Sequence, residues 1–148
     1  VKVPGLDGSG KMGKSEGEGN AIFLADEPEV IRKKVMRAVT DSGPTEENQK
    51  KPEAIENIFS LMKIVSEQQT YDHFNDAYNK MQIRYGDMKK QLGEDMVRFT
   101  APLREKILAL SADEDFVSKV ARRGAEKARE SARATVNAAR QAIGIRSF

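Results

Sequence analysis

Apolar residues recur every three or four positions along most of the chain, which is the spacing of one face of an α-helix. The clearest stripe begins after Pro52 and comprises five apolar residues: Ile55, Ile58, Phe59, Met62 and Val65. Proline suits the first turn of a helix, because the N–H that it lacks has no partner there in any case. The pattern predicts a strongly amphipathic helix that Pro52 opens.

A shorter helix is predicted ahead of this one. Asp26 is placed as its N-cap, since a carboxylate there accepts a backbone N–H and acidic residues favour the first turn. The helix is expected to run to about Val39, with Ile31 and Val35 on the same apolar side and Met36 beside them.

Two helices are predicted after the stripe that Pro52 opens. Thr70 is placed as the cap of a short helix with three aromatic residues facing the core: Tyr71, Phe74 and Tyr78. A long helix is expected from about Asp87 to Leu110, with six apolar residues on one side: Met88, Leu92, Met96, Phe99, Leu103 and Ile107. Because Pro102 lies inside this helix, we expect a kink or break near Phe99.

A final helix is predicted from Asp113, as its cap, to about Ile143, with an apolar side made largely of alanine. No strand-like alternation of useful length appears after residue 25, and no internal repeat is visible. The predicted fold is therefore all-α: a helical bundle over residues 26–148, preceded by a loop segment over residues 1–25. The loop segment begins with the end of a strand at Val1–Val3, and we expect a further N-terminal domain before it.

The composition of the chain says more about its cellular compartment than about its activity. The chain has 148 residues, 39% hydrophobic and 32% charged, with no cysteine and a net charge of +2. The absence of cysteine excludes disulfides and thiolate metal sites, and no apolar run approaches the roughly 20 residues of a membrane span. We expect a cytoplasmic protein with no membrane partner.

Candidate chemistry is concentrated in Gly8-Ser9-Gly10-Lys11-Met12-Gly13-Lys14-Ser15, here called the signature loop. Glycines let a backbone turn inward and present N–H groups, and lysines add point charges on flexible stems. The residues that follow are polar, which indicates an exposed segment. The loop is therefore a candidate polyphosphate site.

The same stretch satisfies the pattern G-x-x-x-x-G-K-[ST] of nucleotide-binding P-loops. A P-loop runs directly into a helix that helps to hold the phosphates, whereas Ser15 is followed by Glu-Gly-Glu-Gly-Asn. Only six residues separate Ser15 from Ile22, too few for the crossover helix of a parallel strand pair. The context argues against a P-loop.

Lys11-Met12-Gly13-Lys14-Ser15 instead resembles the KMSKS signature of class I aminoacyl-tRNA synthetases, with Gly13 in place of the first serine. Three further stretches resemble tryptophanyl-tRNA synthetases: Asp7-Gly8, the helix from Val30 to Ser42, and Gly124-Ala125-Glu126-Lys127-Ala128. The resemblance covers essentially the whole chain, as the C-terminal part of such an enzyme.

The resemblance implies an enzyme that activates tryptophan with ATP, accompanied by Mg²⁺, and transfers it to tRNA. Lys11 and Lys14 would be its catalytic lysines, neutralising charge that develops at the α-phosphate. The nucleotide-binding residues would include Met12, beside the adenine, and Ser15, as a donor to phosphate oxygen. Gly13 would complete this set with one hydroxyl donor fewer than the family pattern and a more flexible backbone.

The resemblance also implies limits. The other signature of the family, of the type His-x-Gly-His, is not in this sequence, so we expect the chain to be inactive alone. The family is dimeric, and a homodimer is expected for the full-length enzyme. The single histidine, His73, has no partner pattern and is interpreted as a surface or packing residue, and no metal ligands are assigned.

Arginines line one side of the final predicted helix. At about 100° per residue, four of them lie within about 20° of one line: Arg122, Arg129, Arg133 and Arg140. This arginine stripe is a candidate tRNA-binding surface, since it can follow a phosphate backbone. The alternative is a solvated face, because Glu126 and Glu130 lie three or four residues from basic residues and can form ion pairs with them on the helix surface.

Two other functions stay open at this point. One is a stand-alone helical RNA-binding module without ATP chemistry. The other is the same region of a tyrosyl-tRNA synthetase, although the helix end Ala38-Val39-Thr40-Asp41 favours the tryptophan enzyme.

Overall fold

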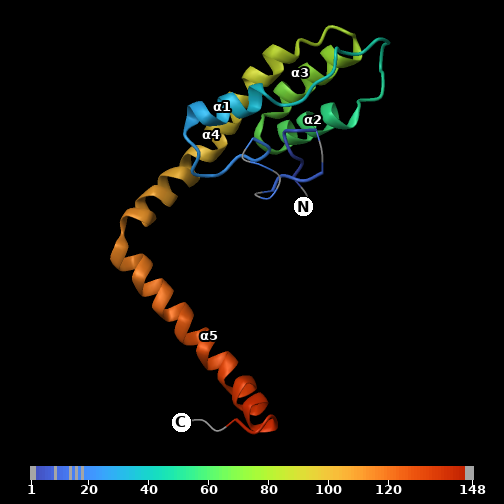
Figure 1. The fold of residues 1–148 in the computed structure, drawn as a ribbon. Coiled ribbons are helices and arrows are strands. Elements are labelled where there is room, and N and C mark those ends of the chain that lie inside the picture. The colour runs from blue at the N-terminus through green and yellow to red at the C-terminus, as the bar shows by residue number, and fades with distance from the viewer. Residues whose placement is uncertain (1–2, 9, 14, 16, 18, 146–148) are drawn as a thin grey trace. The chain divides into compact units, whose positions relative to one another are not determined.

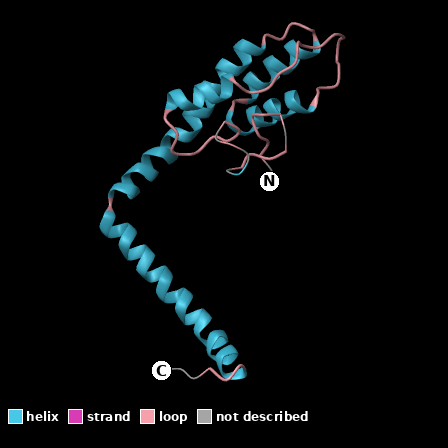
Figure 2. Cartoon of the chain, in the orientation of Figure 1, coloured by secondary structure: helices cyan, strands magenta, loops and turns pink. Residues whose placement is uncertain are grey.

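The computed structural model describes residues 3–8, 10–13, 15, 17 and 19–145. Within these residues the chain forms five helices and no strand (Figures 1 and 2). The helices are α1 (Pro28–Met36), α2 (Glu53–Val65), α3 (Gln68–Asn79), α4 (Tyr85–Ala112) and α5 (Glu114–Ala142). The all-α prediction is confirmed for the described part of the chain. Of the expected strand end, Val3 is not in a strand, and Val1 and Lys2 lie outside the described residues.

The chain divides into two compact units, Val1–Lys106 and Ile107–Phe148, and the boundary falls inside α4. The first unit holds the hydrophobic core, to which Leu6 and α1 to α4 contribute. At its centre Phe59 is fully buried and meets Tyr71 and Tyr78 edge-on, with ring centroids 5.7 Å and 6.1 Å apart. Edge-to-face packing of this kind adds to the free energy gained by burying the rings.

The stripe predicted for the second helix is confirmed. α2 follows Pro52, and four residues of the stripe are buried in the core: Ile55, Ile58, Phe59 and Met62. Val65 packs against them at the helix end. Sequence periodicity succeeds here because every member of the stripe lies on the side of the helix that packs into the core.

The first predicted helix has the right place but the wrong ends. Its N-cap is Glu27 rather than Asp26, and it ends at Met36 instead of Val39. The Asp26 carboxylate instead accepts hydrogen bonds from Phe23 N and Lys34 Nζ, both at Oδ2. Beyond the helix, Val39 N donates to Leu6 O at 3.0 Å and the Val39 side chain is exposed.

α3 and α4 also depart from the prediction. The N-cap of α3 is Glu67, so Thr70 lies within the first turn. α4 continues through Pro102 without a break, and Phe99 and Leu103 are exposed. A proline inside a helix leaves the carbonyl four residues before it without its N–H partner. Pro102 is itself exposed, so water can reach this part of the helix.

A bidentate ion pair between Arg32 and Glu94 joins α1 and α4. Arg32 Nε and Nη2 donate to the two carboxylate oxygens of Glu94 at 2.8 Å and 3.0 Å. Gly93 lies beside Arg32 in this contact, and a Cβ there would meet Arg32 Cα at an ordinary van der Waals distance of 3.7 Å. The hydrogen bond from Arg32 lowers the pKa of Glu94.

In the second unit, Asp113 caps α5 as predicted, and its carboxylate accepts Phe116 N at 2.8 Å. α5 has no buried residue, although its apolar and charged residues are strongly segregated. Among the described residues, no helix is both long enough and apolar enough to cross a membrane.

Candidate functional site

The signature loop is closed at its base by Asn20. Leu6 N donates to the main-chain oxygen of Asn20 at 3.2 Å, and Asp7 N donates to its side-chain Oδ1 at 3.1 Å. Asn20 is 3% exposed. The chain thus enters and leaves the loop through one pair of adjoining segments, held by two hydrogen bonds to one residue.

Met12 fixes the middle of the loop. Its N–H donates to Val3 O at 2.8 Å, and its half-buried side chain packs against the hydrophobic core. Ile22 N approaches the Met12 sulfur at 3.4 Å. This N–H is therefore already paired and is not free for the adenine contact that the resemblance implies for Met12.

The remaining predicted loop residues lie at the surface or outside the described part. Lys11 and Ser15 are exposed, and Gly13 is half-buried. Lys14, the second predicted catalytic lysine, lies outside the described residues. Gly8 has a φ of +81°, a conformation that favours glycine, and a Cβ there would lie 3.0 Å from that of Ala54.

The segment after the loop is clamped to α1 by Lys34. Its Nζ donates to Asp26 Oδ2 at 2.6 Å and to Ala21 O at 3.0 Å, and it lies 4.6 Å from the Phe23 ring centroid. Only 13% of the Lys34 side chain and 15% of the Asp26 side chain are exposed. An ion pair this sheltered from water is screened less than a surface pair. The sequence pattern around Asp26 indicates a helix cap, and only the folded chain reveals its partner.

A second polar cluster lies at the end of α1, and the sequence pattern did not predict it. Tyr85 Oη donates to Asp41 Oδ1 at 2.8 Å, and Lys89 Nζ donates to Thr40 Oγ1 at 3.0 Å. Burial, together with Asp41, raises the pKa of Tyr85, and burial lowers the pKa of Lys89. These residues are far apart in the sequence, so no local pattern indicates the cluster.

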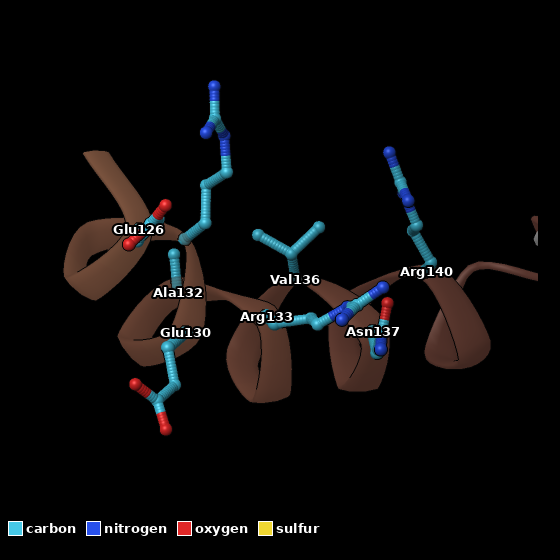
Figure 3. A pocket seen from close by; sticks show the side chains of 8 residues that line it. Glu126, Glu130, Ala132, Arg133, Val136, Asn137 and Arg140 are labelled. Carbon is cyan, nitrogen blue, oxygen red and sulfur yellow. The ribbon is translucent and has the colours of Figure 1, made fainter. Parts of the chain in front are cut away.

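The arginine stripe lies along α5 in the second unit. Figure 3 shows Arg133, Val136 and Arg140 following the helix, with Glu126 and Glu130 on nearby turns. All the lining residues of this shallow surface come from the one helix, and all of them are exposed. Among the described side chains of α5, no arginine is within 4.0 Å of a carboxylate, so the ion pairs that the sequence spacing allows are not formed here.

Neither unit offers a metal centre in its described part. Among the described residues, no three side chains of histidine, cysteine, aspartate or glutamate are grouped to hold a metal ion. His73 is exposed on α3 and its ring meets Phe74 edge-on at 5.1 Å, as expected of a packing residue.

Comparison with known proteins places the chain in one family. Residues 2–101 match the family model described as "tRNA synthetases class I (W and Y)". Over 146 residues the chain is 60% identical to a tryptophan–tRNA ligase of Porphyromonas gingivalis, covering 99% of this chain and 44% of that relative. It is 42% identical over 137 residues to tryptophan–tRNA ligase 1 of Streptomyces coelicolor, covering 91% of this chain and 39% of the relative. The chain thus spans less than half the length of these curated relatives.

Solved structures of synthetases from this family also resemble the chain. The crystal structure of tryptophanyl-tRNA synthetase from Campylobacter jejuni, complexed with ADP and tryptophan, matches 97% of this chain and 44% of its own, with a TM-score of 0.72 and 27% identity. Tyrosyl-tRNA synthetase from Aeropyrum pernix, at 19% identity, matches 80% of this chain and 37% of its own with a TM-score of 0.60, which shows a shared fold.

Proposed function

This chain belongs to the tRNA synthetases of class I (W and Y), and on that premise we propose that it is the C-terminal part of a tryptophan–tRNA ligase. The observation that carries the proposal is 60% identity to a tryptophan–tRNA ligase over nearly the whole chain. The C. jejuni relative, solved with ADP and tryptophan, supports ATP and tryptophan as substrates. The third substrate is the tRNA for tryptophan.

The signature loop serves the first half of the proposed reaction. A carboxylate oxygen of tryptophan attacks the α-phosphorus of ATP, the bond to the bridging oxygen breaks, and pyrophosphate leaves. Negative charge grows on the phosphate oxygens in this step, and Lys11 and Lys14 neutralise it. Positioned cations are most effective where water is excluded, so the loop has to close over the nucleotide.

In the second half, a hydroxyl of the terminal ribose of tRNA attacks the carbonyl carbon of the adenylate, and AMP leaves.

The other two loop residues also act in the first half of the reaction. Ser15 donates a hydrogen bond to a phosphate oxygen during activation. Gly13 supplies no hydroxyl, and its flexible backbone raises the entropy cost of loop closure.

Magnesium accompanies ATP in this proposal. Lysine carries no lone pair for a cation while protonated, and the described loop side chains include no carboxylate apart from Asp7 at its base. The loop therefore does not fit a magnesium site, and we assign no step of the reaction to the metal.

The rest of the chain serves tRNA. We propose that residues 1–25 form the edge of the catalytic domain and residues 26–148 the anticodon-binding domain. The stripe of Arg122, Arg129, Arg133 and Arg140 follows the tRNA backbone, a role supported by its exposure and by the lack of ion pairs at these described side chains. The full-length ligase is a cytoplasmic homodimer in this proposal.

Amino-acid-dependent exchange of pyrophosphate into ATP tests the proposed activity. The complete enzyme that carries this chain should catalyse exchange with tryptophan and much less with tyrosine. Exchange with tyrosine alone would assign the chain to the tyrosine branch of the family. No exchange with either amino acid would refute the proposed chemistry.

A further inference from the structure

We propose that Asn20 is a positioning residue for Lys11 of the signature loop, an inference that rests on the function proposed above. Its two hydrogen bonds, at 3.2 Å from Leu6 N and 3.1 Å from Asp7 N, join the segment that enters the loop to the segment that leaves it. Lys11 and Lys14 both lie between these joined segments. Asn20 itself reaches no substrate and acts through the loop.

The segment before the loop is fixed to the residues that follow α1, and the segment after the loop is fixed to α1 itself. Leu6 O accepts Val39 N at 3.0 Å, just beyond the end of α1. On the other side, Ala21 O accepts Lys34 Nζ at 3.0 Å, within α1. Asn20 therefore joins two segments that are each hydrogen-bonded to a further part of the chain, and Lys11 lies between these two segments in the sequence.

Asn20 is not the residue that stability alone would favour. It is 3% exposed, and its Nδ2 has no hydrogen-bond partner among the described residues. Burying an unpaired N–H costs free energy, so the other contacts of the Asn20 side chain have to offset this cost. The gain at Asn20 is the Oδ1 acceptor that holds Asp7 N.

The chain also makes room for this side chain. A Cβ at Gly5 would lie 2.7 Å from Asn20 Nδ2, closer than real Cβ atoms come to other heavy atoms. Gly5 is thus required for the Asn20 amide to occupy its present position. The hydrogen bond from Asp7 N to Asn20 Oδ1 can therefore be removed in two ways. Asn20→Ala deletes the amide, and Gly5→Ala displaces it.

Tied ends reduce the number of conformations open to the segment that carries Lys11, and therefore the entropy cost of placing its charge. Loss of the tie should misplace charges that act chiefly in the transition state, while tryptophan still binds in the ground state. A residue that merely stabilises the fold would lower thermal stability without this kinetic signature.

The test measures pyrophosphate exchange by the complete enzyme. Asn20→Ala should lower kcat about 10- to 100-fold with little change in the KM for tryptophan. Gly5→Ala should have the same effect. Asn20→Asp keeps an acceptor for Asp7 N and should be faster than Asn20→Ala. Asn75→Ala is the matched control, since it also removes one side-chain hydrogen bond of an asparagine, the one from Lys51 Nζ at 2.8 Å, and should leave kcat unchanged.

A double-mutant cycle with Lys11→Ala separates positioning from general damage. If Asn20 acts through Lys11, adding Asn20→Ala to Lys11→Ala should slow exchange much less than adding it to the wild type does. Full multiplication of the two effects, or a wild-type kcat in Asn20→Ala, would overturn this inference and leave the proposed function intact. If Lys11→Ala and Lys14→Ala themselves exchange at the wild-type rate, it is the proposed function that fails.

Discussion

Met12 separates the two lysines of the signature loop and is held on both its main chain and its side chain. Lys11, beside this fixed point, is exposed. A cation next to an anchored residue has a restricted range of positions, which suits a charge that must meet a developing anion. In the proposed function, this charge acts in the transition state of activation rather than on bound tryptophan.

Removal of either lysine should therefore slow activation. Lys11→Ala and Lys14→Ala are each expected to lower the rate of adenylate formation about 10²- to 10³-fold, the cost of losing one group that stabilises a transition-state charge. The affinity for tryptophan should change little. Single-turnover kinetics with labelled ATP measures both quantities. Lys50→Ala, which removes an exposed lysine from another loop, is the control.

Tyr85 gives a pH-dependent prediction. Its pKa is raised, first by burial and then by Asp41, so the folded chain holds the phenol proton more tightly than the unfolded chain does. This contribution to stability is fully present below the unfolded pKa of about 10 and is lost as pH rises towards the folded value. The free energy of unfolding should thus fall above pH 10, and less steeply in Tyr85→Phe.

Urea denaturation of both forms between about pH 7 and pH 11 measures this difference. At pH 7, Tyr85→Phe should cost about 1 kcal/mol, for one hydrogen bond to Asp41. Identical pH dependence in the two proteins would contradict the assignment of the raised pKa to Tyr85.

At the level of elements, the sequence predicts the presence of the helices better than the residues at which they begin and end. The stripe of α2 was identified residue by residue, because amphipathic spacing reports directly on burial. The caps at Asp26 and Thr70 were wrong, because a carboxylate or hydroxyl can serve a distant partner instead of the nearest helix. Lys34 is such a partner for Asp26, and nothing local to Asp26 reveals it.

Part of the candidate site is visible in the local sequence, and part depends on the fold. The signature loop could be named as a candidate from the sequence alone, because its lysines and glycines are contiguous there. Asn20 and the Asp41–Tyr85 contact were missed because they depend on which segments the fold brings together. Periodicity also placed Phe99 and Leu103 on an apolar side, whereas both are exposed on α4.

Phe59 tests the packing of α2. It is fully buried and contacts the rings of Tyr71 and Tyr78. Phe59→Ala should lower the free energy of unfolding by about 3–5 kcal/mol, through the removal of buried apolar surface and the cavity left behind. Chemical denaturation monitored by circular dichroism measures this change. Ile64→Ala, at an exposed position of the same helix, should be far milder, and equal destabilisation of the two variants would contradict a core centred on Phe59.

At the level of the whole molecule, the two units offer different chemistry. The first holds the core and the signature loop, and the second presents exposed arginines without carboxylate partners among its described side chains. Exposed cations contribute to nucleic-acid affinity by releasing counterions, so their effect depends on salt. The chain covers less than half of its curated relatives, so these two units correspond to only part of those enzymes.

Binding of tRNA tests the arginine stripe. Fluorescence anisotropy of this chain with the tRNA for tryptophan, at several salt concentrations, should show weaker binding for the Arg129→Ala, Arg133→Ala double variant. The slope of log K against log salt should become shallower by about 0.7–0.9 for each phosphate that the variant no longer neutralises. An anticodon-altered tRNA should bind less tightly than the native one. An unchanged slope would make the stripe a solvated face.

The central claim is tested most directly by aminoacylation. The complete enzyme should attach labelled tryptophan to the tRNA for tryptophan, and the Lys11→Ala, Lys14→Ala double variant should fail at adenylate formation. In the same assay, tyrosine and the tRNA for tyrosine should give little product. Charging of the tRNA for tryptophan at the wild-type rate by the double variant would contradict the role of the signature loop, and no charging by the wild type would contradict the proposed function as a whole.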